Sequence, residues 1–426
     1  MYCGYITKLS NIRAMPNADR LNLADCFGNQ VIVSKNHTED ELGVYFPVDG
    51  QLSEEFCEAN DLVRRKNPDG TNGGGYLDPN KRNIRALKLR GERSDGLWLP
   101  ISCFEYLDKH SFDFKEGDQI TSIDGKEICN KYIPKHNYPK QFNGKPNRKK
   151  KKYNFVFPEH IDTPQLAYCL SNFKKGDRIT ITEKLEGTSH RSALVPVKTN
   201  SWWRKLLRLP EKVEWKDVCG SRRVLIEEQE PNDGFYGTSN FRLEVHKKIK
   251  PFLMKNMEVF AEIVGWPGEG MAPLMGEVDT TCLKNKEFSR DYGKTMVFNY
   301  GCDEGKFDFY VYRICLLDDD GSVAVEFSTE QIQDYCEKCG WKYVPVLFKG
   351  FINGPEEVEK LAQEYCDGES TLGHHWREGC VIRRDNKAYK FDVYKQKNFA
   401  FKMMRGLATE NMKVEGLSED IIEEMS

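Results

Sequence analysis

The sequence predicts an α+β protein in which a small, strand-rich domain precedes a larger mixed domain. Three observations carry this prediction. Short strand-like runs separated by turns fill residues 1–130, a stretch rich in Pro, Asn and Lys follows, and an alternating strand pattern opens the second part. The chain has 426 residues, of which 39% are hydrophobic, so it is long enough to bury more than one core.

Residues 1–130 consist of short segments with strand-forming residues, bounded by turn residues. The strongest candidates are Tyr5–Leu9, Leu21–Cys26, Gln30–Ser34 and Gly43–Val48. Several short strands at such spacing favour a small β-barrel. Residues 66–82, which contain Gly73, Gly74 and Gly75, are expected to form a loop within this domain.

The clearest domain boundary lies at residues 131–155, between a first domain of residues 1–130 and a second of residues 156–426. Pro, Asn and like charges oppose a packed element, and the stretch contains the basic run Arg148–Lys152. This linker is either a solvated tether or a segment that binds nucleic-acid phosphates and gains affinity by counterion release.

Bulk properties exclude several classes. The net charge of −3 gives no global signature of nucleic-acid binding, so a polyanion site has to come from local basic groups. No apolar run is long enough to cross a membrane, and the N-terminus lacks a signal-peptide pattern. We expect a monomer in the cytoplasm or another intracellular compartment, without membrane contact and with its 14 cysteines reduced.

Lys184 is the most informative residue of the second domain. Asp177–Glu183 alternates as a half-buried strand does, Lys184 follows, and Gly187 comes three residues later. Burial and neighbouring cations lower the pKa of a lysine and free its lone pair for attack on phosphorus. Gly187 lets the backbone approach a bound phosphate closely. The alternative is an ordinary strand-end lysine before a turn.

Further motifs follow Lys184 in a fixed order. They are Ser221–Arg223, Val259–Trp266 with Glu262, Phe309–Ile314 with Tyr312, Arg377–Ile382 with Glu378, and Tyr394–Asn398 with Lys395 and Lys397. Together with the Lys184 motif, this order resembles motifs I, Ia, III, IIIa, IV and V of the covalent nucleotidyltransferases, the superfamily of polynucleotide ligases and capping enzymes. The resemblance implies a nucleotidyltransferase domain of two antiparallel sheets with flanking helices around a nucleotide cleft.

The arrangement of the domains points to one branch of that superfamily. Met15–Ala24 and Lys88–Pro100 resemble the OB-type barrel that precedes the catalytic domain in some RNA ligases. We find no motif VI and too few residues after Asn398 for a trailing OB domain. The chain therefore resembles the ATP-dependent RNA ligases of the Deinococcus and Naegleria type, often called family 5, and similar phage RNA ligases. After Phe401–Leu407 we expect a short helix in the acidic tail.

The resemblance assigns roles around ATP. Lys184 attacks the α-phosphorus and becomes lysyl-AMP, and Glu183 and Gly187 contact the nucleotide. Glu186 stands where an aspartate is more usual in the family. Glu186 and Glu378 are expected to bind Mg²⁺ or Mn²⁺, partly through water. The alternative for Glu186 is a surface ion pair.

Four other positions complete the expected ATP site. Arg222 contacts a phosphate of ATP or of the RNA 5′ end. Glu262 binds the ribose hydroxyls or a metal-bound water, or else forms a buried ion pair. Tyr312 stacks on adenine, with Tyr310 as the competing choice. Lys395 and Lys397 alternate with Gln396 and neutralise the α-phosphate, and Lys390 is the alternative for the first lysine.

The predicted function is sealing of 3′-OH/5′-phosphate breaks in RNA, through lysyl-AMP and an AMP-capped 5′ end. The resemblance implies a nicked duplex whose 3′-OH strand ends in ribonucleotides, and hence RNA repair. The alternatives are a DNA ligase, an mRNA-capping-type transferase that uses GTP, and a non-catalytic RNA-binding protein that uses the first domain and the linker. His374 and His375 are read as a polar loop before Glu378, not as a metal site.

Overall fold

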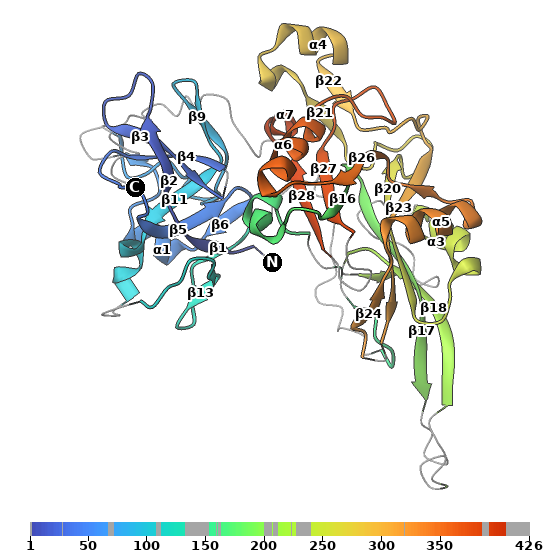
Figure 1. The fold of residues 1–426 in the computed structure, drawn as a ribbon. Helices are drawn as coiled ribbons and strands as arrows, with labels where there is room; N and C mark the ends of the chain where they lie inside the picture. The colour runs from blue at the N-terminus through green and yellow to red at the C-terminus, as the bar shows by residue number, and fades with distance from the viewer. Residues whose placement is uncertain are drawn as a thin grey trace. The chain divides into compact units, whose positions relative to one another are not determined.

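The computed structural model describes residues 2–27, 29–66, 72–107, 112–132, 153–158, 160, 163–199, 207, 212–222, 224–226, 240–318, 320–385 and 392–405. The chain divides into two compact units, Met1–Asn143 with Lys402–Ser426, and Gly144–Phe401. Figure 1 shows the first in blue to cyan and most of the second in green to red. Most of the predicted linker, Arg223, Lys390 and the acidic tail lie outside the described residues.

The first unit is built of short strands. They are β1 (Gly4–Lys8), β2 (Ser10–Ala14), β3 (Leu21–Cys26), β4 (Asn29–Ser34), β5 (Leu42–Pro47), β6 (Gly50–Leu52), β7 (Arg65–Lys66), β8 (Asn72–Gly73), β9 (Leu87–Leu89), β10 (Glu92–Ser94), β11 (Gly96–Pro100), β12 (Gln119–Ile120), β13 (Ser122–Ile123), β14 (Lys126–Glu127) and β15 (Cys129–Lys131), with helices α1 (Glu54–Ala59) and η1 (Ile101–Leu107). The four strands predicted from the sequence are confirmed as β1, β3, β4 and β5, to within a residue or two at each end.

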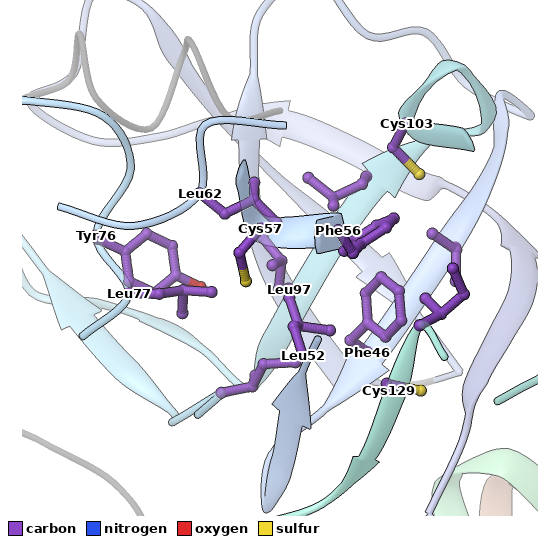
Figure 2. Packing of buried hydrophobic residues seen from close by; sticks show 14 of the residues in the cluster. Phe46, Leu52, Phe56, Cys57, Leu62, Tyr76, Leu77, Leu97, Cys103 and Cys129 are labelled. Atoms are coloured by element: carbon purple, nitrogen blue, oxygen red, sulfur yellow. The ribbon is translucent and has the colours of Figure 1, made fainter. Parts of the chain in front are cut away.

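These strands do not form a closed barrel in the described part of the unit. A four-stranded sheet has the order β11-β5-β1-β12, and a separate three-stranded sheet has the order β2-β3-β4. The chain passes from one sheet to the other at the buried Leu9. The strand-forming residues before Leu9 form β1 of the four-stranded sheet, and those after it form β2 of the three-stranded sheet. Figure 2 shows the core of this unit, where Phe46 and Leu97 pack with Phe56 of α1. The predicted OB-type barrel is therefore not confirmed, and the described strands form a strand-rich unit of separate small sheets.

The remaining elements include longer strands and lie in the second unit, except that the last helix runs past its boundary at Phe401. They are η2 (Leu166–Asn172), β16 (Arg178–Lys184), β17 (Thr188–Thr199), β18 (Lys212–Gly220), β19 (Leu225–Ile226), α3 (Phe241–Ile249), η3 (Lys250–Phe252), β20 (Met257–Gly265), β21 (Glu277–Asp279), η4 (Thr281–Leu283), α4 (Lys286–Tyr292), β22 (Thr295–Val297), β23 (Phe307–Leu317), β24 (Val323–Glu326), α5 (Thr329–Cys339), β25 (Lys342–Tyr343), β26 (Val346–Phe351), α6 (Pro355–Cys366), β27 (Gly379–Arg384), β28 (Val393–Lys397) and α7 (Phe399–Met404).

Two main sheets form this unit, as the sequence predicted. The smaller has the order β26-β16-β27-β28, and η2 and α6 share its buried core. The larger has the order β19-β18-β17-β20-β23-β24, with α3 and α5 in its core. All their strand pairs are antiparallel except β25, which runs parallel to β23. The chain crosses from the smaller sheet to the larger directly after Lys184, between β16 and β17 (Figure 1).

Among the described residues, no helix has the length and apolar character needed to span a bilayer.

Candidate active site

Lys184 is the last residue of β16, and directly after it the chain leaves the smaller sheet and enters the larger one. Ile179 and Ile181 of this strand are fully buried in the core shared with α6. Because side chains alternate along a strand, Lys184 lies on the opposite face from these isoleucines. The β16 register sets Lys184 opposite Gly379 of β27, and Gly379 is in turn opposite Lys397 of β28. The sheet thus aligns two lysines on either side of a glycine.

Glu378 places its carboxylate between these two lysines. Its Oε1 is 2.7 Å from Lys184 Nζ and 3.4 Å from Lys397 Nζ. The Glu378 side chain is only 2% exposed. Burial disfavours the charged form, but the two ammonium groups outweigh burial and lower the pKa of Glu378. Motifs I, IV and V therefore meet in one charge cluster around a buried carboxylate.

Gly379 makes this arrangement sterically possible. Its φ of 151° lies in the region that favours glycine, and a Cβ at this position would lie 2.1 Å from the carbonyl oxygen of Gln396. With no side chain between them, β27 and β28 approach closely, and the space between Lys184 and Lys397 is left to Glu378.

Gly187 also allows a close approach within the protein. A Cβ on Gly187 would lie 2.4 Å from the carbonyl oxygen of Ile263 and 2.9 Å from Cγ of Glu262. The glycine therefore allows the segment after Lys184 to pack on β20 of the larger sheet. This packing brings Lys184 and Glu262 to one cavity.

Glu262 forms part of the wall on the larger sheet. Ser189 of β17 donates a hydrogen bond of 3.4 Å from its hydroxyl to Glu262 Oε2. Burial raises the pKa of Glu262 to about 7, although the positive charge of Lys184 opposes the shift. The charge of Glu378 acts in the same direction as burial. The raised pKa means that the Glu262 carboxyl would gain from a hydrogen-bonding or cationic partner in the cavity.

A cavity of about 310 Å³ joins these groups. It is lined by Lys184, Leu185, Glu186, Gly187, Thr188, Ser189, Ser221, Arg222, Arg242, Glu262 and Glu378. The structure therefore brings together six of the predicted site residues around one hollow, and Lys397 reaches the same cluster through Glu378. Such a concave site with convergent charged groups is typical of a ligand-binding pocket.

Arg242 is a cavity residue that the sequence analysis missed. It lies in the first turn of α3, is 8% exposed, and its guanidinium donates to the Ser189 carbonyl and to the Thr188 hydroxyl. With Arg222 it gives this end of the cavity two cations, and both guanidinium charges oppose the upward shift of the Glu262 pKa. Arg242 stands among apolar helix positions and belongs to no recognisable motif, so only the fold reveals its location.

Tyr312 lies beside the cavity residues because β23 carries a bulge. Phe260 pairs with Arg313, whereas the next residue, Ala261, pairs with Val311, which leaves Tyr312 as the extra residue. The Tyr312 hydroxyl is 2.8 Å from His160 Nε2. Burial raises the Tyr312 pKa, and Glu262 contributes to the shift.

Tyr310, the competing choice for an adenine platform, faces different neighbours. The Lys342 ammonium lies 5.5 Å from the centre of the Tyr310 ring, and Lys342 also pairs with Asp308. Tyr310 is also the cross-strand partner of Glu262 in the β20–β23 ladder, so both tyrosines have Glu262 as a neighbour.

Glu183 points away from the cavity. It alternates with Lys184 on β16, and its carboxylate accepts hydrogen bonds from the hydroxyls of Ser370 and Thr371. Because this side chain is already engaged, any contact of Glu183 with a nucleotide has to come from its main chain. Lys395 shares a face of β28 with Lys397, and the predicted alternative Lys390 lies outside the described residues.

The carboxyl groups suit a hard divalent cation in part. Among the described residues, Glu378 Oε2 is buried and has no hydrogen-bond partner, and the Glu186 carboxyl lies close enough to Glu378 to affect its pKa. Carboxylate oxygens are the ligands that Mg²⁺ and Mn²⁺ prefer. Within the described ranges, no group of three or more His, Cys, Asp or Glu side chains is arranged as a metal site. The residues therefore fit a cation held by few protein oxygens, with water or phosphate completing its shell.

Comparison with known proteins identifies the class to which this fold and site belong. A family model described as RNA ligase matches residues 177–404, which is more than half of the chain and includes every motif from β16 to β28. The chain belongs to the RNA ligase family. No curated protein matches the sequence.

Solved structures show the same fold over nearly the whole chain. The Naegleria gruberi RNA ligase with PPi has a TM-score of 0.60 and 20% identity, covering 94% of this chain and 97% of that one. A lysine-to-alanine mutant of the same ligase with ATP and Mn has a TM-score of 0.59 and 18% identity, covering 93% and 97%. A lysine-to-methionine mutant with AMP and Mn has a TM-score of 0.58 and 18% identity, with the same coverage. The two units thus follow the architecture of one RNA ligase.

Proposed function

We propose that this protein is an ATP-dependent RNA ligase that uses Lys184 as its nucleophile. The observation that carries the proposal is the Lys184–Glu378–Lys397 cluster at a cavity that also holds Glu262 and Arg222. Membership of the RNA ligase family and the ATP, AMP and PPi named for the Naegleria structures support it.

In the first step, the Lys184 ammonium loses a proton to water. Its Nζ then bonds to the α-phosphorus of ATP while the bond from that phosphorus to the bridging oxygen breaks, and a second proton leaves the nitrogen for water. Pyrophosphate leaves with the electron pair, and AMP stays on the lysine. Lys397 lies close enough to Lys184 to neutralise the same phosphate oxygens, and Lys395 shares its face of β28. In the second step AMP passes to a 5′-phosphate end, and in the third a 3′-hydroxyl displaces it.

The remaining groups orient the nucleotide. Glu262 is suited to the ribose hydroxyls and Tyr312 to the adenine ring, and Gly187 and the Glu183 main chain line the nucleotide's path. Arg222 suits a phosphate of ATP or of the RNA end. Glu378 and Glu186 would hold Mg²⁺ or Mn²⁺, which would supply charge neutralisation at the phosphates. The Mn named for the Naegleria structures supports this assignment.

We further propose that the enzyme acts as a monomer on a nicked duplex with a ribonucleotide 3′-OH, and that the first unit is an OB-type module that engages RNA. The motif resemblance of Met15–Ala24 and Lys88–Pro100 supports that role. The alternating strands β1 and β3 to β5 are compatible with it.

The test is covalent labelling with ATP radiolabelled at the α-phosphate, followed by denaturing electrophoresis. We expect wild-type protein with Mg²⁺ or Mn²⁺ to retain the label, GTP to give none, and Lys184→Ala to lose labelling while its circular dichroism and unfolding temperature stay normal. Labelling of the alanine variant at the wild-type level would show that Lys184 is not the nucleophile.

A further inference from the structure

Two loops that carry no recognised motif pack against each other beside Lys184. They are residues 298–302, which follow β22, and residues 370–375, which precede Glu378. Their backbones approach so closely that a Cβ on Gly301 would lie 2.7 Å from the Leu372 carbonyl oxygen. A Cβ on Gly373 would lie 3.1 Å from the Gly301 nitrogen. Because larger residues at either glycine would separate them, the two loops behave as one packed unit.

His375 locks this contact. Its ring is fully buried, and Nε2 accepts a hydrogen bond of 3.3 Å from the Tyr300 amide. The same ring meets the Tyr300 ring edge-on, with 4.4 Å between the ring centres. Burial lowers the pKa of His375, which keeps the imidazole neutral and Nε2 free to accept. The predicted polar loop is thus a buried structural contact at His375, whereas His374 is exposed.

The first loop holds the chain directly after Lys184. The Tyr300 hydroxyl accepts a 2.5 Å hydrogen bond from the backbone amide of Glu186. Tyr300 is 2% exposed and has a φ of 51°, a left-handed conformation that is uncommon for an aromatic residue. Strained residues of this kind persist where the surroundings fix them, and they cluster at functional sites.

The second loop holds the chain directly before Lys184. Ser370 donates a 2.5 Å hydrogen bond to Glu183 Oε1, and Thr371 donates to Oε2 from its amide at 2.9 Å and from its hydroxyl at 2.8 Å. Glu183 is 1% exposed, so these bonds satisfy a carboxylate that would otherwise be costly to bury. One residue before Lys184 and two residues after it, the backbone is therefore fixed by the same pair of loops.

We propose that these loops form a brace that sets the position of the nucleophile, with Tyr300, Glu183 and Ser370 as positioning residues for the adenylylation step. The inference rests on the proposed function of Lys184. An in-line attack needs the nitrogen within about 3–3.5 Å of the phosphorus, and a displacement of about 1 Å costs roughly 100-fold in rate. The brace acts through the Glu183 side chain and the Glu186 amide, and so fixes the main chain on either side of Lys184.

The test is Tyr300→Phe, which keeps the ring and removes only the oxygen that accepts from Glu186. We expect the single-turnover rate of adenylylation to fall about 10- to 100-fold, while the ATP concentration for half-maximal rate stays unchanged. Ser370→Ala should show the same split. The matched control is Tyr335→Phe, which removes a tyrosine hydroxyl bonded to the Phe252 carbonyl in the same unit and should leave the rate unchanged.

Wild type and Lys184→Ala run beside these variants. If wild type forms no adduct, the proposed function fails; if wild type labels and Tyr300→Phe labels at the same rate, only the brace is overturned. A raised ATP requirement with an unchanged rate would also overturn it, because that pattern marks a binding role. If Tyr300→Phe does not fold, as judged by thermal unfolding, Ser370→Ala decides by the same criteria.

Discussion

Two lysines share one buried carboxylate in the catalytic cluster, but their geometry differs. Lys184 is 2.7 Å and Lys397 is 3.4 Å from Glu378 Oε1. If Lys184 becomes bonded to AMP, its amine no longer carries a full positive charge. Lys397 is then the cation left beside Glu378 and the α-phosphate, so its charge matters in every later step.

We therefore expect Lys397→Ala to reduce adenylylation about 100-fold or more, the usual cost of removing a group that stabilises transition-state charge. Lys395→Ala should reduce it as well, because Lys395 faces the same way on β28. Single-turnover labelling measures both. Normal labelling of the double alanine variant would move this role to Lys390.

Glu262 links the site to stability through its protonation. Burial raises its pKa from 4.5 to about 7, so between these values the folded chain holds a proton that the unfolded chain has lost. The free energy of unfolding consequently falls as pH rises through this window. The charged groups facing Glu262 are Lys184, Glu378, Arg222 and Arg242.

Glu262→Gln should remove this dependence, since glutamine cannot ionise. We expect the variant to be about 1–2 kcal/mol more stable than wild type at pH 8, since one pKa unit corresponds to about 1.4 kcal/mol and the half-buried site is partly solvated. At pH 4.5 the two proteins should unfold alike. Chemical denaturation in EDTA without nucleotide measures the difference, and an equal pH slope in both proteins would contradict the interpretation.

At the scale of elements, the bulge in β23 gives Tyr310 and Tyr312 different surroundings. A regular strand would present Tyr310 and Tyr312 on one face, two residues apart. With the bulge, Tyr312 lies near Glu262 and its hydroxyl meets His160, whereas Tyr310 pairs with Glu262 across the ladder and lies under Lys342. Bulges often re-aim a side chain next to an active site in this way.

Tyr312→Ala should therefore raise the KM for ATP about 10- to 100-fold, because stacking on an aromatic ring contributes about 1–3 kcal/mol per base. Tyr312→Phe should keep a KM near that of wild type, and Tyr310→Ala serves as the control for losing a tyrosine from the same strand. A larger KM effect from Tyr310→Ala than from Tyr312→Ala would reverse the assignment.

Local periodicity in the sequence predicted the strands that carry the site. It could not predict site residues whose positions depend on contacts between distant parts of the chain. The alternation in Asp177–Glu183 predicted β16, and the alternation in Lys395–Lys397 predicted β28. That same alternation puts the side chains of Glu183 and Lys184 on opposite faces of β16. Tyr300 and Arg242 act through partners more than 50 residues away, at Glu186 and Ser189, so no local pattern marks them.

For the whole molecule, the two units have separate cores, and all cavity-lining residues belong to the second. If Lys184 is the nucleophile, as proposed, adenylylation should therefore depend on side chains of the second unit. RNA is a larger ligand than ATP, and an additional strand-rich unit offers more surface for it.

Deletion of residues 1–130 should consequently preserve labelling by ATP and impair sealing of nicked RNA by at least about 10-fold, an amount equal to about 1.4 kcal/mol of lost RNA binding. Labelling and sealing assays on the same preparation measure the two activities. Equal sealing by the truncated and full-length proteins would show that the first unit is dispensable for catalysis on RNA.

The crossover after Lys184 has a further consequence. The lysine belongs to the smaller sheet and Glu262 to the larger, and only Leu185, Glu186 and Gly187 connect β16 to β17. If AMP is bonded to Lys184 and its ribose is bound by Glu262, the nucleotide would be a second link between the smaller and the larger sheet. The lysyl-AMP form of the enzyme should then have a higher unfolding temperature than the free enzyme. This extra stability should be lost when AMP is transferred to RNA.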